Sequence, residues 1–109
     1  MEEKEYRELV SREFKKIEKA FDDVDPDRAE FDLAQGAATI VFPDGMKLIL
    51  SQQPSVRQIW VAAATKGVAH HFGYDATAEK WMDDKGKGIE LLAFVGEMVR
   101  DAAGIALTF

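Results

Sequence analysis

The order of the predicted elements constrains the fold of this chain more than any other feature of its sequence. Apolar residues recur at three- and four-residue steps over residues 3–23 and from Ile89 to Ala102, which predicts an amphipathic helix in each region. Short segments between them alternate apolar and polar residues, and connections of a few residues can join only antiparallel strands. We therefore predict an α+β fold, a two-layer α/β sandwich with two terminal helices packed on one face of a five- to six-stranded antiparallel sheet.

Turn residues place the boundaries of these elements. Pro26 follows the first helix, Gly104 stands where a helix C-cap is expected, and Gln35-Gly36 and Lys66-Gly67 mark turns between strands. We expect the alternating tail, residues 105–109, to pack along the helices. The predicted strands cover residues 29–34, 37–42, 46–51, 56–65, 69–74 and 79–82.

Composition narrows the class of protein. The 109 residues suffice for one domain, over residues 1–109, and contain neither an apolar run of membrane-spanning length nor a recognisable secretory leader. We therefore expect a cytoplasmic protein that does not enter membranes. Cysteine is absent, so any metal must be held by oxygen or imidazole nitrogen.

Negative charge is concentrated in one short segment. The chain carries a formal net charge of -6, and between Glu18 and Asp32 seven acids face only two bases, Lys19 and Arg28. Such a field repels nucleic acid and attracts cations or basic proteins. It also lies at a helix C-terminus, where negative side chains are unfavourable. Either the segment serves a function or it is an acidic turn screened by solvent. Its acids are Glu18, Asp22, Asp23, Asp25, Asp27, Glu30 and Asp32.

A second candidate surface lies on the predicted strand at residues 56–65. Ile59 and Val61 share one face of this strand, whereas Gln58 and Trp60 share the other. If the helices cover only the first face, the indole of Trp60 is exposed on a contact surface. The alternative is that a further layer or an oligomer buries it.

The sequence offers two histidines as possible nitrogen ligands and contains no catalytic motif. His70 and His71 are adjacent in a predicted strand, so they point to opposite faces and cannot share a metal. We expect one to be packed and the other to lie on the surface, with an accessory role left open. The sequence has no nucleophile elbow, phosphate loop or helical His-Glu metal motif. We therefore predict no catalytic residues and no enzyme.

The sequence resembles bacterial, CyaY-type members of the frataxin family along nearly its whole length. The resemblance rests on motifs in the same order as in that family: Phe21-Asp22-Asp23, the run from Thr39 to Gly45, Gln53-Pro54, Gln58-Ile59-Trp60-Val61, Gly67, Phe72, Trp81, Gly86 and Leu91-Leu92. It implies an α/β sandwich and an accessory, regulatory role in iron–sulfur cluster assembly.

The resemblance also implies particular sites and partners. The seven acids would form a ridge that binds Fe²⁺ or Fe³⁺ weakly and exchangeably. Trp60, with Gln58, would face a partner. The partners would be a cysteine desulfurase and an iron–sulfur scaffold protein, with the protein itself monomeric in the absence of metal.

Two alternatives remain open at the level of sequence. In the first, the acidic segment binds a basic surface of the desulfurase, Trp60 anchors the scaffold, and metal binding is incidental. In the second, the chain is an unrelated acidic domain with the same order of elements, which would bind neither assembly protein.

Overall fold

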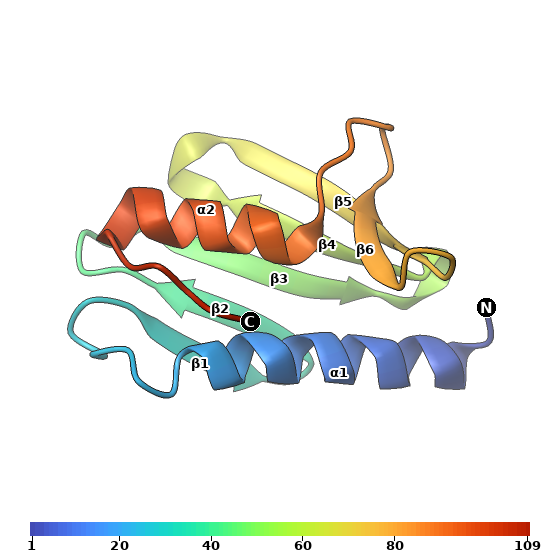
Figure 1. The fold of residues 1–109 in the computed structure, drawn as a ribbon, viewed down its shortest axis with the longest axis horizontal. Coiled ribbons are helices and arrows are strands. Elements are labelled where there is room, and N and C mark those ends of the chain that lie inside the picture. The colour runs from blue at the N-terminus through green and yellow to red at the C-terminus, as the bar shows by residue number, and fades with distance from the viewer.

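The protein folds into two layers, with both helices on one face of a six-stranded sheet (Figure 1). This computed structural model covers residues 1–109. The helices are α1 (Glu3–Ala20) and α2 (Leu91–Ala103). The strands lie in sequence order, each antiparallel to its neighbours: β1 (Glu30–Ala34), β2 (Ala37–Val41), β3 (Lys47–Gln53), β4 (Gln58–Ala63), β5 (Val68–Asp75) and β6 (Lys80–Asp83). The predicted fold class is confirmed, and neither helix has the length and apolarity needed to cross a bilayer.

Two predicted elements, the first helix and the fourth strand, extend several residues beyond their bounds in the structure. The first helix ends at Ala20, because the amide of Phe21 bonds back to Glu18 in a tightened last turn. The fourth strand covers only Gln58–Ala63, since short 3₁₀ turns flank it on both sides. Apolar alternation continues through these turns, so it could not reveal where the strand ends.

The turn between β1 and β2 is the two-residue hairpin that the sequence predicts. Gln35 and Gly36 both have positive φ, 52° and 77°, as the tightest hairpin turns require. A Cβ at Gly36 would lie 2.7 Å from Nε2 of Gln52, and that Nε2 donates a hydrogen bond to the Gly36 carbonyl at 2.8 Å. Glycine is therefore favoured here by its positive φ, whereas the contact with Gln52 could be relieved by a shift of that flexible side chain.

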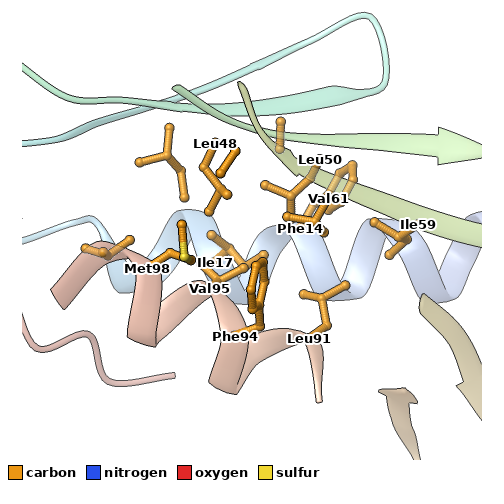
Figure 2. Close-up of a cluster of buried hydrophobic side chains, with 14 of the residues drawn as sticks. Phe14, Ile17, Leu48, Leu50, Ile59, Val61, Leu91, Phe94, Val95 and Met98 are labelled. Carbon is orange, nitrogen blue, oxygen red and sulfur yellow. The ribbon is translucent and has the colours of Figure 1, made fainter. Parts of the chain in front are cut away.

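One hydrophobic core fills the space between the layers. Figure 2 shows side chains of both helices meeting those of β3 and β4, including Ile17, Leu50, Val61 and Val95. All four are fully buried or nearly so, and each such side chain contributes about 1.5–3 kcal/mol by leaving water. The core thus fixes one sheet face against the helices, and no element covers the other face.

Polar and terminal contacts complete the packing. The hydroxyl of Tyr6 on α1 donates to the Gln58 carbonyl at 2.5 Å and accepts from the Gln53 amide at 3.0 Å. Ile105 and Leu107 of the tail pack against the core, which confirms the expected position of the tail. A Cβ at position 96 would lie 3.4 Å from the ring of Phe109, an ordinary van der Waals contact, so space alone does not require the glycine within α2.

Candidate functional site

The seven predicted acids gather where α1 ends and β1 begins, and we call this region the acidic end. Every one of these residues is exposed, and none forms an ion pair. The nearby base Arg28 forms no ion pair with them, and its guanidinium donates to the Ala103 carbonyl at 2.7 Å. The acidic end therefore carries an excess of negative charge, with seven acids against Lys19 and Arg28 and no ion pair among them. Its members are Glu18, Asp22, Asp23, Asp25, Asp27, Glu30 and Asp32.

Aromatic packing holds the two parts of the acidic end together. The rings of Phe21, which caps α1, and Phe31 on β1 stack with their centroids 5.9 Å apart. Beside them, Glu18, Asp22 and Glu30 line a shallow depression of about 260 Å³. These three carboxylate residues, from the helix, the turn and the strand, are therefore neighbours.

The remaining acids lie around this depression. Asp23 and Asp25 line a second hollow, on the side of the tail, and the Asp25 carboxylate accepts the Asp27 amide at 2.9 Å. Asp32 pairs with Thr39 on the sheet face away from the helices. The structure thus brings the acids to one end of the molecule, but no three acidic or histidine side chains in it are arranged to hold a metal ion.

The indole of Trp60 lies on the uncovered face of the sheet. Its neighbours in β4, Ile59 and Val61, are fully buried against the helices, so Trp60 points the other way. It is half-buried because His71, its partner in β5, stacks on it with ring centroids 4.1 Å apart and planes at 9°. No layer of this chain covers the indole.

Two side-chain hydrogen bonds and one ionic contact join Trp60 and its stacked partner His71 to Gln58 and Asp84. Nε1 of Trp60 donates to Oε1 of Gln58 at 2.8 Å, and Nε2 of Gln58 donates to Oδ2 of Asp84 at 3.2 Å. The same Oδ2 lies 3.6 Å from Nδ1 of His71, and the Asp84 amide donates to the His71 carbonyl at 2.9 Å. We call Gln58, Trp60, His71 and Asp84 the Trp60 cluster.

Sequence reasoning found two members of this cluster and missed the others. Trp60 lies opposite His71 in the register of β4 and β5. This register depends on the geometry of the turn between the two strands, which could not be predicted from the sequence. The two histidines do lie on opposite faces, as predicted: His70 packs edge-on against Phe94 of α2, with centroids 4.7 Å apart.

Asp83 organises the loop that carries Asp84. Its carboxylate accepts hydrogen bonds from the amides of Lys85, Lys87 and Ile89, at 3.2, 3.0 and 2.9 Å. Because these bonds favour the ionised form, with the Lys87 amide contributing most, they hold the pKa of Asp83 below its usual 3.8. An ionised Asp83 therefore keeps this loop in place at neutral pH.

Glu13 is a buried acid that the sequence analysis did not single out. It is 5% exposed, and burial raises its pKa from 4.5 to about 7, against the opposing charge of Lys16 at 3.9 Å. The nearby carboxylate of Glu90, which caps α2 by accepting two amides, raises it further. Its place between Val10 and Ile17 on the apolar stripe could have revealed it.

Comparisons with known proteins agree with this fold. The frataxin-like domain model matches residues 1–105. The iron-sulfur cluster assembly proteins CyaY of Pseudomonas fluorescens (strain Pf0-1) and Stutzerimonas stutzeri (strain A1501) are each 35% identical over 109 residues, which cover 100% of this chain and 96% of each relative.

Solved structures give the same result. Frataxin from Psychromonas ingrahamii superposes with a TM-score of 0.87 at 25% identity, covering 98% of this chain and 96% of that one. Trimeric yeast frataxin from Saccharomyces cerevisiae, complexed with ferrous, shares the fold with a TM-score of 0.62 at 23% identity, covering 96% and 88%. The family model, the relatives and the architecture together show that the chain belongs to the frataxin family.

Proposed function

We propose that this protein is an accessory factor of iron–sulfur cluster assembly, which binds Fe²⁺ or Fe³⁺ weakly at the acidic end and docks on a cysteine desulfurase and a scaffold protein. The names of its relatives support the process. The observation that carries the iron-binding part is the set of seven exposed carboxylates, none of which forms an ion pair.

The chemistry of the acidic end suits a loosely held cation. Carboxylate oxygens are hard ligands, and the chain has no cysteine to favour a softer metal. Full exposure and the lack of a preformed ligand group leave the cation hydrated and free to exchange. Such a site fits delivery or sensing rather than catalysis, which needs a fixed metal geometry with supporting contacts.

Docking would use both surfaces. The acidic end is complementary to a basic surface on the desulfurase, and charge of this kind mainly speeds encounter. Trp60 and Gln58 lie on the sheet face that no helix covers, where an indole can anchor the scaffold. The protein would thus meet its two partners through different chemistry.

Anaerobic isothermal titration with Fe²⁺ tests the metal site. We expect the wild type to bind with a Kd on the order of micromolar, weaker in high salt, with Mn²⁺ or Ca²⁺ competing. Asp22→Asn combined with Asp23→Asn should reduce binding severalfold. Glu8→Gln with Glu97→Gln removes two exposed charges from other parts of the helices and should not. Equal binding by both double variants would refute the assignment.

A second candidate function is a pure interaction module, in which metal binding is incidental. It is favoured by one observation, namely that no three potential ligands are arranged to hold a metal ion. Pull-down of the desulfurase with and without a chelator separates the two functions. Binding and regulation that persist in the chelator support the module, whereas their loss supports an iron-dependent role.

A further inference from the structure

We infer that His71 and Asp84 are positioning residues, which hold the indole of Trp60 in the orientation that meets the scaffold protein. This inference rests on the proposed docking function. It adds two residues outside the predicted site, and it states the chemistry of the contact: an apolar or aromatic side chain of the scaffold against the ring of Trp60.

Asp84 decides which way the Gln58 amide points. A carboxylate can only accept hydrogen bonds, so Gln58 must direct its NH₂ group at Asp84, 3.2 Å away. Its carbonyl oxygen is thereby turned toward Trp60, whose Nε1–H can only donate, at 2.8 Å. Without the carboxylate the amide can flip, which would face NH₂ against the indole N–H and release the ring.

His71 restrains the indole from another side. Its ring lies 4.1 Å from that of Trp60 and almost parallel to it, so it covers one face of the indole. Its own backbone accepts the Asp84 amide at 2.9 Å, which ties the stack to the loop that carries Asp84. The indole of Trp60 is therefore restrained both by stacking from His71 on β5 and by its hydrogen bond to Gln58, which Asp84 orients.

These contacts determine what a partner can use. Because Gln58 already satisfies the indole N–H, the ring offers its apolar surface rather than a hydrogen-bond donor. The adjoining residues on the uncovered face, Ala62 and its cross-strand partners Ile49 and Ala69, are also apolar. A ring held before the encounter loses little further freedom on binding, so its positioning adds to affinity.

The test compares substitutions that break the cluster with conservative ones that keep it. Asp84→Ala removes the acceptor, whereas Asp84→Asn can still present an oxygen to Gln58. His71→Ala removes the stacked ring, whereas His71→Phe keeps it. Two quantities are measured: the solvent-exchange rate of the Trp60 indole N–H by NMR, and the affinity for purified scaffold protein, with Trp60→Ala as the reference.

We expect each alanine variant to speed indole exchange and to weaken scaffold binding about five- to tenfold, and each conservative variant to restore most of both. Adding Asp84→Ala to Trp60→Ala should weaken binding no further. Unchanged indole exchange in Asp84→Ala, or an equal loss of affinity in the Trp60→Ala background, would overturn the inference. If Trp60→Ala itself binds scaffold normally, the docking proposal fails, while indole exchange still reports on positioning.

Discussion

Helix α1 and the turn that follows it carry carboxylates in two contrasting environments. Glu13 lies within the core, 5% exposed, whereas Asp22 and its neighbours at the acidic end are in water. The same chemical group is unfavourable in both places, but for different reasons. At Glu13 the cause is loss of hydration, and at the acidic end it is mutual repulsion together with the negative end of the helix.

The difference shows which solution condition relieves the unfavourable free energy of each group of carboxylates. Glu13 can take up a proton, so pH controls it. The repulsion at the acidic end can be relieved by any cation, so ionic strength controls it. An exposed group of like charges therefore couples stability to cation binding, which a single buried acid does not.

The largest expected effect is at Glu13. Its pKa of about 7 in the folded protein exceeds 4.5, so the stability it contributes is fully present below pH 4.5 and is lost as the pH rises through 7. Glu13→Gln should therefore raise the free energy of unfolding at pH 8 by roughly 2–3 kcal/mol and change it little at pH 4.5. Urea denaturation at the two pH values measures this.

Lys16→Ala provides the control for that experiment. Lys16 is the opposing charge 3.9 Å from Glu13, so its removal should destabilise the protein at pH 8 more than at pH 4.5. If Glu13→Gln gives the same gain at both pH values, the gain comes from packing or helix propensity and not from desolvated charge.

A smaller gain in stability is expected at the acidic end. Asp22→Asn with Asp23→Asn should stabilise the protein by about 0.3–1 kcal/mol per residue at low salt, because both lie at the negative end of α1. The gain should shrink in high salt. Thermal unfolding at two ionic strengths checks it, with Glu8→Gln and Glu97→Gln as the matched double variant. A salt-independent gain would contradict the electrostatic explanation.

The smallest effect on global stability is expected at Asp83. Unlike the other acids, its ionised form is favoured by its surroundings. Asp83→Ala should speed amide hydrogen exchange at Lys85, Lys87 and Ile89 and leave the melting temperature nearly unchanged. In the wild type the same loosening should appear as the pH falls through the lowered pKa of Asp83. Exchange at these amides that is indifferent to both changes would show that other contacts hold the loop.

Sequence reasoning recovered the two layers and the antiparallel direction of successive strands because both follow from local patterns. Periodicity identifies helices and strands, and short turns force antiparallel neighbours. The acidic end was also visible, because its members are close along the chain. Its arrangement was not, since Asp32 faces the uncovered side of the sheet while Asp23 lies beside the tail.

The Trp60 cluster shows where such reasoning stops. Alternation puts Gln58 and Trp60 on one face, but pairing with His71 depends on the register set by the turn at residues 64–67. Asp84 lies in a loop that is shaped by hydrogen bonds between the Asp83 carboxylate and backbone amides. Periodicity in the sequence does not predict such bonds. Glu13 could have been found by looking for a charged residue on the apolar stripe of α1.

The order of strands in the sheet has a consequence for how the molecule assembles. Since each strand pairs only with its neighbour in sequence, hairpin after hairpin can close over a short stretch of chain, at little entropic cost. By contrast, Tyr6 bonds to Gln53 and Gln58, about half the chain away. We expect the docking of α1, with its long separation along the chain, to set the folding rate.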